Sequence, residues 1–294
     1  MNRREFLGVL AKTWVAATVS GCTTLRPARE DEIYQLSDFG QARILHITDT
    51  HAQLNPVYFR EPNVNLGLGA ARGRFPHKVG RNLLDAIPGL NPRQAHALTY
   101  LDFSEAAERY GRVGGFSHLA SLVKQLRANS SGSLLLDGGD TWQGSGTSLW
   151  TRGKDMVGAC NLLGVDVMTG HWEFTYSEDE ILRNTEFFNG DFIAQNIKAT
   201  EDALFENVPI FDEDSGHVFP PYVVKTINGK RIAVIGQAFP YTPIANPKRF
   251  IPNWTFGIQE QDLEELVIHI RATEHPDAVV LLSHNGMDVD LKLA

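Results

Sequence analysis

The sequence predicts an α/β domain in which mixed β-sheets are covered by helices. Beyond residue 42, apolar runs of strand length alternate with segments of helical periodicity, as in α/β proteins. The strand-like stretch 222–238 contains Asn228-Gly229, a dipeptide typical of a tight β-hairpin. A hairpin adds an antiparallel pair to the parallel strands that alternation favours, so we expect mixed sheets. The length of 294 residues suits one large domain, or one domain with a small extra.

The expected elements follow one another in order along the chain. Strands are expected at 43–48, 133–137, 166–169, 191–196, on both sides of the turn in 222–238, and at 278–282. Helices are expected at 115–128, 156–163, 177–188 with Ser177 as its cap, and 259–273. Residues 55–114 break this rhythm, and we expect them to form an insertion near the functional face.

Composition limits the class of partner. Hydrophobic residues make up 43% of the chain and charged residues 21%, which is ordinary for a soluble globular protein. The formal net charge of −8 leaves no basic surface for nucleic acid, so we expect no nucleic-acid partner. A small anionic substrate held by a metal ion is compatible with this charge.

The N-terminus resembles an export signal. Arg3-Arg4 precedes Phe6-Leu7 and a weakly apolar stretch, 8–19, as in twin-arginine signals. That stretch carries Lys12 and is too short to span a membrane. The stretch 19–22 ends in Cys22 and resembles a lipobox, which predicts a lipid anchor; the alternative is a simple cleaved signal with an incidental cysteine. We therefore expect an export signal at 1–22, a linker at 23–41 and a periplasmic location.

Cys160 is the only other cysteine, so no internal disulfide framework exists. It shares helical spacing with Met156, Val157 and Leu163. This pattern predicts a buried small hydrophobic residue in preference to a nucleophile.

Residues that can bind a metal recur where the expected strands end. Asp49 and His51 follow the first strand, Asp140 the second, His171 the third and His284 the last. In α/β sheets, ligands collect outside the carboxyl ends of strands, where loops converge. Each signal is weak alone, because Asp-x-His occurs by chance and a single histidine is more often structural. Their joint placement after four strands predicts a metal site.

The ligand types indicate the chemistry of this site. Two carboxylates and three imidazoles suit Mn²⁺, Fe or Zn²⁺, and they do not distinguish among them. A carboxylate after the second strand could bridge two such ions, which lie roughly 3.5–4 Å apart in two-metal hydrolases. A water bound there loses a proton near neutral pH and becomes a hydroxide nucleophile, while the ions stabilise negative charge on the group under attack.

Four ordered motifs resemble those of the calcineurin-like metallophosphoesterases, within the branch that contains 5′-nucleotidases. They are Asp49-x-His51, Gly138-Gly139-Asp140, Gly170-His171-Trp172-Glu173-Phe174 and Ser283-His284-Asn285-Gly286. The resemblance implies an α-β-β-α sandwich of two mixed sheets flanked by helices, with two metal ions bridged by Asp140. It implies that Asp49, His51 and His284 serve one ion, whereas Asp140 and His171 connect to the second, although the sequence leaves the partition between the two ions open. His46, on the strand before the ligands, is then structural.

The third motif departs from the nucleotidase pattern Gly-Asn-His-Glu-Phe-Asp. His171 stands where that pattern has a metal-binding Asn, Trp172 where it has the catalytic His, and Thr175 where it has the Asp that orients this His. Loss of the last two removes an imidazolium that would neutralise phosphoryl charge. Nucleotide hydrolysis by the usual mechanism is therefore not expected.

The altered motif resembles that of the SoxB family, the thiosulfohydrolases of the bacterial sulfur-oxidation system. Residues 49–54, 139–146 and the insertion after 54 resemble the same family. The resemblance implies a periplasmic dimanganese enzyme that releases sulfate from a cysteine S-thiosulfonate on a SoxYZ-type carrier protein. In the mechanism that this resemblance implies, a metal-bound hydroxide would attack the terminal sulfonate sulfur, and the persulfide leaving group would need little help from a general acid.

Several expectations remain open at this point. Trp142 and Trp172 either line a channel for a carrier arm or simply pack beside the metal loops. The family pattern continues with a Gly-x-His motif and a C-terminal substrate domain beyond Ala294, so we expect one weak metal position and low activity from residues 23–294. The alternatives are a periplasmic 5′-nucleotidase or phosphodiesterase, and a non-catalytic remnant that binds the carrier.

Overall fold

The computed structural model describes residues 40–58, 68–99, 104–206 and 208–294 of the chain. The predicted export signal 1–22 with its Cys22, and most of the predicted linker 23–41, lie outside the described residues. Within these four ranges, no helix is both long enough and apolar enough to cross a membrane.

The first β-sheet has four strands, and its pairings are parallel. In spatial order the strands are β1 (Arg43–Ile47), β2 (Ser133–Asp137), β3 (Val167–Met168) and β4 (Asp191–Phe192). This sheet is not mixed, because each connection contains a helix that returns the chain to the same end of the sheet. The last residues of β1 and β2 are paired in register, so the loops after both strands begin side by side.

The second sheet is mixed, as expected. β6 (Tyr222–Ile227) and β7 (Lys230–Gln237) form the predicted hairpin, and β9 (Ala278–Ser283) pairs with β7 in parallel. Asn228 and Gly229 have φ angles of 49° and 77°. A type I′ hairpin turn requires positive φ at both central residues, which explains why this dipeptide marks the turn.

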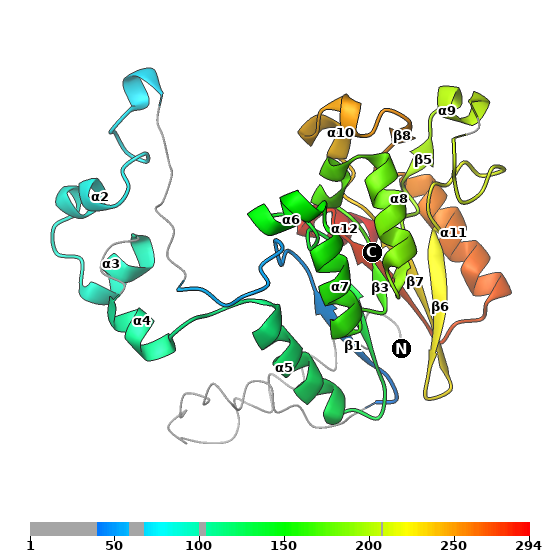
Figure 1. Ribbon diagram of the computed structural model, residues 1–294, viewed down its shortest axis with the longest axis horizontal. Helices are drawn as coiled ribbons and strands as arrows, with labels where there is room; N and C mark the ends of the chain where they lie inside the picture. Colours follow the sequence, from blue (N-terminus) through cyan, green and yellow to red (C-terminus); the bar gives the residue numbers. More distant parts are fainter. Residues whose placement is uncertain (1–39, 59–67, 100–103, 207) are drawn as a thin grey trace. The chain divides into compact units, whose positions relative to one another are not determined.

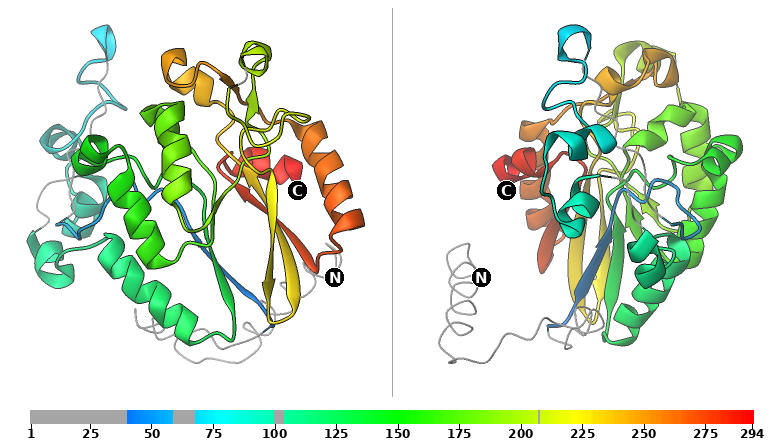
Figure 2. Two further views of the ribbon diagram at one scale, coloured as in Figure 1. Left: turned by 45° about the vertical axis from the view of Figure 1, so that its right-hand side comes forward. Right: turned by 90° about the vertical axis from the view of Figure 1, so that its left-hand side faces the viewer.

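Helices cover the outer face of each sheet (Figures 1 and 2). α5 (Phe116–Ala128), α7 (Lys154–Leu163) and α8 (Glu178–Phe187) pack on the first sheet. α11 (Glu260–Thr273) packs on the second sheet through Leu263 and Ile270. The order of layers is therefore helix, sheet, sheet, helix, and the predicted sandwich is confirmed.

The alternation of side chains along the strands divides the apolar core among these layers. Successive residues of a strand point to opposite faces of its sheet. Leu135 of β2 lies in the cluster beneath α5, α7 and α8, whereas Leu134 and Leu136 lie between the sheets with Val234 of β7. Cys160 of α7 is fully buried in the outer cluster, which confirms its prediction as a core residue.

Two local expectations were wrong in detail. The strand expected at 191–196 ends at Phe192, because the next residues leave the first sheet: the Ala194 N–H donates to Pro220 O and the Gln195 N–H to Gly236 O. Ser177 precedes α8 but does not cap it with its side chain. Three acidic residues in the first turn of α8, at 178–180, complement the positive end of the helix instead.

Residues 55–114 contain more regular structure than the sequence pattern indicated. An antiparallel bridge between Val57 and Val113 closes the base of this segment. Its short elements are η1 (Gly69–Ala71), α2 (Arg81–Ala86), α3 (Pro92–Leu98) and α4 (Ser104–Tyr110). The start of α3 could have been predicted from the sequence, because Asn91 and Gln94 form a capping box with Pro92 between them.

The remaining elements are short and lie outside the alternation of strands and helices. They are α6 (Gly146–Thr151), η2 (Trp172–Tyr176), β5 (Lys198–Ala199), α9 (Glu201–Phe205), α10 (Thr242–Ala245), η3 (Lys248–Phe250), β8 (Trp254–Thr255) and α12 (Met287–Leu293). β5 and β8 pair with each other in antiparallel orientation.

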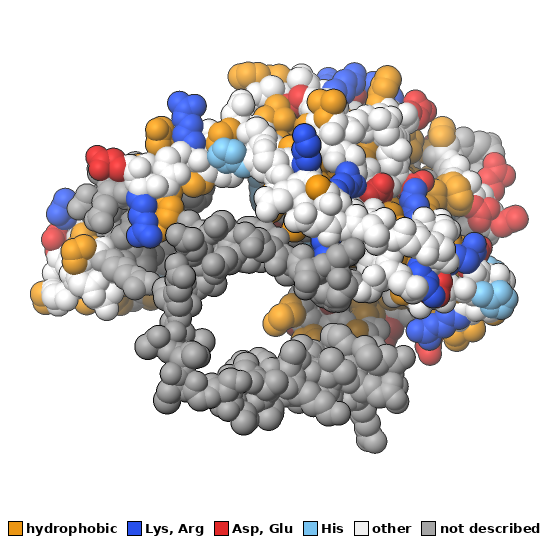
Figure 3. Space-filling view, turned by 90° about the horizontal axis from the view of Figure 1, so that it is seen from below, with side chains coloured by type: hydrophobic (Ala, Val, Ile, Leu, Met, Phe, Trp, Pro, Cys, Tyr) orange, Lys and Arg blue, Asp and Glu red, His pale blue; other side chains and the backbone are white. Residues whose placement is uncertain are grey.

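On the face drawn in Figure 3, the acidic and basic side chains of the described residues are interspersed.

Candidate metal centre

The loops after β1 and β2 run beside each other at the carboxyl edge of the first sheet. The backbone N–H groups of Asp49, His51 and Ala52 donate to the carbonyls of Gly139, Asp140 and Thr141, at 3.0, 3.0 and 3.1 Å. Asp49, His51 and Asp140 have φ angles of 53°, 49° and 58°. Residues other than glycine adopt this conformation infrequently, so the bonds between the loops hold the candidate ligands in place.

Gly144 brings the end of the second loop against the first. Its φ is 138°, and a Cβ at this position would lie 2.5 Å from the carbonyl oxygen of His51. A separation below 3.0 Å is a backbone clash, so a residue with a side chain would push the two loops apart. Only glycine therefore fits at position 144 while His51 keeps its place.

His171 and His284 reach the same place from the ends of β3 and β9. His171 Nδ1 lies 3.2 Å from Asp140 Oδ2, and the centroids of the two histidine rings are 4.2 Å apart. His284 Nδ1 lies 2.7 Å from Gly138 O and must donate to it, because a carbonyl oxygen only accepts. This bond leaves Nε2 of a neutral His284 ring with a free lone pair, 3.8 Å from Asp49 Oδ1.

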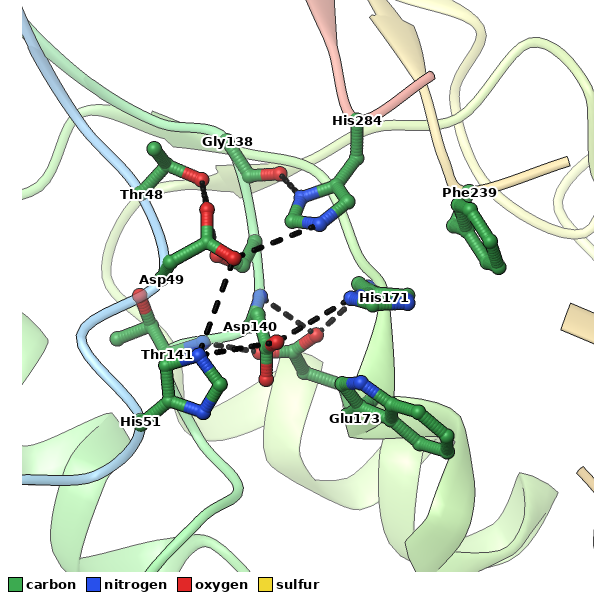
Figure 4. Close-up of polar contacts among 12 residues, drawn as sticks. Thr48, Asp49, His51, Gly138, Asp140, Thr141, His171, Glu173, Phe239 and His284 are labelled. Carbon is green, nitrogen blue, oxygen red and sulfur yellow. Dashed lines mark hydrogen bonds and ion pairs between the residues drawn. The ribbon is translucent and has the colours of Figure 1, made fainter. Parts of the chain in front are cut away.

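The five predicted residues form two ligand groups that share Asp140 (Figure 4). The inner group is Asp140, His171 and His284, and the outer group is Asp49, His51 and Asp140. Within each group the potential ligand atoms lie within 4.8 Å of one another. His284 thus groups with His171, whereas the family resemblance assigned it to the ion of Asp49 and His51.

The donor set fits divalent cations. Asp140 Oδ1 is buried and has no hydrogen-bond partner among the described residues. A buried carboxylate oxygen without a partner is costly, and a cation beside it would satisfy it. Carboxylate and imidazole ligands together suit a borderline-hard divalent ion.

The two tryptophans have different environments. Trp142 has no exposed surface, and its ring packs against Phe188 and Phe192 at centroid distances of 5.7 and 5.6 Å. It therefore belongs to the core, and its prediction as a substrate contact was wrong, because a side chain without exposed surface cannot line a channel. Trp172 is partly exposed, with its ring centroid 5.1 Å from that of His171. Its side chain lies beside the inner group.

Two buried carboxylates lie behind the ligand loops. Asp137, at the end of β2, accepts hydrogen bonds from the Gly139 N–H and from Thr141 Oγ1, at 3.0 and 2.9 Å. Burial raises the pKa of the Asp137 carboxyl well above its usual range. Glu173 is fully buried and accepts hydrogen bonds from the backbone N–H groups of Asp140 and His171.

Sequence reasoning gave no role to Glu173 or to Phe239, whose ring lies 4.4 Å from that of His171. Glu173 lies between two aromatic residues in the sequence, and this position could have indicated that its carboxylate is buried. No local pattern indicates that Phe239, after β7, approaches His171. His46, expected to be structural, lies in neither ligand group.

The fold of this chain is also found in a known phosphoesterase. The structure resembles that of the calcineurin-like phosphoesterase YfkN of Bacillus subtilis, with a TM-score of 0.52 and 18% identity, over 83% of this chain and 62% of that one. This similarity shows the fold alone. No protein-family model matches the chain.

Two further relatives are similar in sequence. The sulfate thiohydrolase SoxB of Thermus thermophilus is 34% identical, with a TM-score of 0.66, over 88% of this chain and 46% of that one. The 5′-nucleotidase of Rattus norvegicus is 30% identical over 188 residues, which cover 62% of this chain and 30% of that protein. The chain thus spans less than half the length of these relatives. The predicted resemblance to SoxB, within the 5′-nucleotidase and calcineurin-like superfamily, is confirmed.

Proposed function

We propose that this chain is the metal-binding part of a thiosulfohydrolase that releases sulfate from a cysteine S-thiosulfonate on a SoxYZ-type carrier protein. The observation that carries the proposal is His171 in the inner ligand group with Trp172 beside it. The nucleotidase pattern has an Asn and a catalytic His at these two positions. The identity of 34% to SoxB over 88% of the chain supports the same assignment.

The side chain of Thr175 supports the loss of the nucleotidase acid–base pair. Thr175 Oγ1 donates to the carbonyl of Trp172 at 2.8 Å, so it turns back to the backbone of its own 3₁₀ turn. Neither Trp172 nor Thr175 can protonate a leaving group. A persulfide is a stable anion and leaves without protonation, which makes a thiosulfonate a suitable substrate for this site.

Asp49, His51, Asp140, His171 and His284 are the residues that we assign to two divalent ions, and we propose Mn²⁺ as the resident metal. When bound, such ions lower the pKa of a water and stabilise negative charge on the group under attack. Asp140, which is shared by both ligand groups, holds the two halves of the centre together. Trp172 remains our candidate for contact with the carrier arm.

The proposed enzyme acts outside the cytoplasm. The paired arginines at 3–4 support export by the twin-arginine route, and the lipobox-like 19–22 supports a lipid anchor at Cys22. Export in the folded state suits a protein that binds its metal before leaving the cytoplasm. We propose a periplasmic location in which the carrier protein is also present.

Sulfate release from thiosulfonate-loaded carrier protein tests the proposal. The chain is reconstituted with Mn²⁺, and phosphate release from a nucleoside monophosphate is measured in parallel. Sulfate release that stops on chelation supports the proposal. Phosphate release without sulfate release overturns it in favour of a nucleotidase, for which the 30% identity to the rat enzyme is the supporting observation. Carrier binding without either product supports a non-catalytic binding role.

A matched variant sharpens this test. The triple substitution His171→Asn, Trp172→His and Thr175→Asp restores the nucleotidase pattern in this chain. We expect it to lose sulfate release and to gain phosphate release, because it regains a general acid beside a weaker metal ligand. Unchanged sulfate release by the triple variant would show that these three residues do not determine the substrate.

A further inference from the structure

The carboxylate of Glu173 accepts hydrogen bonds from four backbone N–H groups. Oε2 accepts from Asp140 at 3.1 Å and from His171 at 2.7 Å. Oε1 accepts from Thr141 at 2.7 Å and from Trp142 at 3.0 Å. The side chain is fully buried, so water does not compete for these donors. Glu173 thus joins the loop after β2 to the loop after β3 (Figure 4).

One oxygen of this carboxylate sets the spacing of two metal-ligand candidates. The two N–H groups on Oε2 belong to Asp140 and His171, whose side chains meet 3.2 Å apart at Oδ2 and Nδ1. Two residues anchored to one atom cannot move apart without breaking a hydrogen bond to a charged acceptor. Such bonds are stronger than those between neutral groups.

The charge of Glu173 also points to the metal centre. No Lys, Arg or His side chain in the described ranges forms an ion pair with Glu173. A buried carboxylate without a cationic partner is costly, and amide donors alone offset part of that cost. Divalent ions held by the ligand groups would supply the missing positive charge.

We propose that Glu173 is a positioning residue, which holds Asp140 and His171 at metal-binding distance before the ion arrives. This inference rests on the proposed metal centre. A purely structural role predicts that loss of Glu173 lowers the melting temperature alone. Our proposal predicts that the metal affinity of the folded protein also falls. Removing the hydrogen-bond partner of a ligand typically reduces metal affinity by about 10–100-fold.

Glu178 offers a matched control five residues further along the chain. It is also buried, and its carboxylate accepts from the backbone N–H and from Nδ2 of Asn253, at 2.7 and 2.9 Å. Its donors belong to neither ligand group. Glu173→Gln and Glu178→Gln therefore remove the same chemical group from two buried hydrogen-bond sites, only one of which holds the ligand loops.

The experiment measures Mn²⁺ affinity by isothermal titration and the melting temperature of the metal-free protein. The amide of Glu173→Gln has one acceptor oxygen and an NH₂ group, so two of the four N–H groups lose their acceptor. We expect its Mn²⁺ affinity to fall by about 10–100-fold, while Glu178→Gln keeps wild-type affinity. Equal affinities of Glu173→Gln and wild type, or equal losses in both variants, would overturn the proposal.

A measurement on the wild-type protein covers the case in which Glu173→Gln does not fold. We expect the amides of Asp140, Thr141, Trp142 and His171 to exchange slowly with solvent deuterium in the absence of metal, because Glu173 already binds them. Fast exchange of these amides without metal, and protection only after Mn²⁺ is added, would show that the ion and not Glu173 orders the loops. If the wild-type chain binds no Mn²⁺, the proposed metal centre fails instead.

Discussion

The two ligand groups differ in how far solvent reaches them, although they share Asp140. In the inner group, the side chains of His171 and His284 are 14% and 12% exposed. In the outer group, those of Asp49 and His51 are 48% and 57% exposed. The inner group is restrained by the packing of Phe239 on His171 and by the hydrogen bond from His284 to Gly138 O. The Glu173 carboxylate also binds the backbone N–H of His171. The outer side chains have fewer restraints.

This difference predicts unequal metal affinities. Ligands that are already held in place lose little freedom when the ion binds, and charge interactions are stronger where water is excluded. The inner group should therefore bind the first ion and release it last. The outer group, which depends on two exposed side chains and on Asp140, should exchange its ion readily.

The largest effect is expected from Asp140→Asn, because this residue serves both groups. The substitution keeps the size of the side chain but removes the charge. We expect metal affinity to fall at both positions by more than the about 10–100-fold that follows loss of a ligand's hydrogen-bond partner. Metal content after desalting, measured by mass spectrometry, checks this result. Retention of one full equivalent would mean that Asp140 is not shared.

Alanine substitution of one histidine from each group separates the two positions. His171→Ala should abolish the tightly held equivalent of Mn²⁺, and His51→Ala should remove only the weakly held one. The check is metal content during competition with a chelator of graded concentration. In wild type we expect two steps, the first from the outer group. A single step that both variants shift equally would contradict the division into two groups.

The contrast also shows which parts of the centre could be predicted from sequence. Asp49, Asp140 and His171 were predictable because parallel strands in register deliver the loops that follow them to one edge of the sheet. The Asn-Gly hairpin was predictable because the turn itself demands those residues. In both cases, a local pattern determines the geometry.

Features that depend on tertiary packing were not predictable in this way. Trp142 and Trp172 both lie within two positions of a ligand candidate in the sequence, yet Trp142 enters the core beside Phe188 and Trp172 remains beside His171. The end of β4 depends on hydrogen bonds from Ala194 and Gln195 to the carbonyls of Pro220 and Gly236, which are distant in the sequence. The role of Glu173 depends on the fold that brings two loops around its carboxylate.

Gly144→Ala should damage the outer group and spare the inner one. The added Cβ meets the carbonyl of His51 at 2.5 Å, and the φ of 138° is strained for alanine. We expect the first loop to shift and the weakly held ion to be lost, with the inner ion still bound. Chelator competition is again the measurement, and Gly158→Ala is the control, since a Cβ there meets nothing within 4 Å. Loss of both ions would indicate that the two loops form one unit.

The smallest effect is expected from Thr48→Val, which removes one hydroxyl group beside the outer group. This hydroxyl also lies 3.4 Å from the carbonyl oxygen of Gly139. Thr48 Oγ1 donates to Asp49 Oδ2 at 2.6 Å, and valine has the same shape without the donor. Asp49 is half-exposed, so water competes for this bond and its contribution falls to that of an ordinary hydrogen bond, about 0.5–1.5 kcal/mol. This corresponds to roughly a 2- to 13-fold lower affinity at the outer position. Thr50→Val is the matched control, because in the described structure Thr50 Oγ1 is buried and has no hydrogen-bond partner. If Thr48→Val weakens binding of the tightly held ion instead, the outer side chains contribute to the inner group. The exposure of Asp49 would then not show that the two groups bind their ions independently.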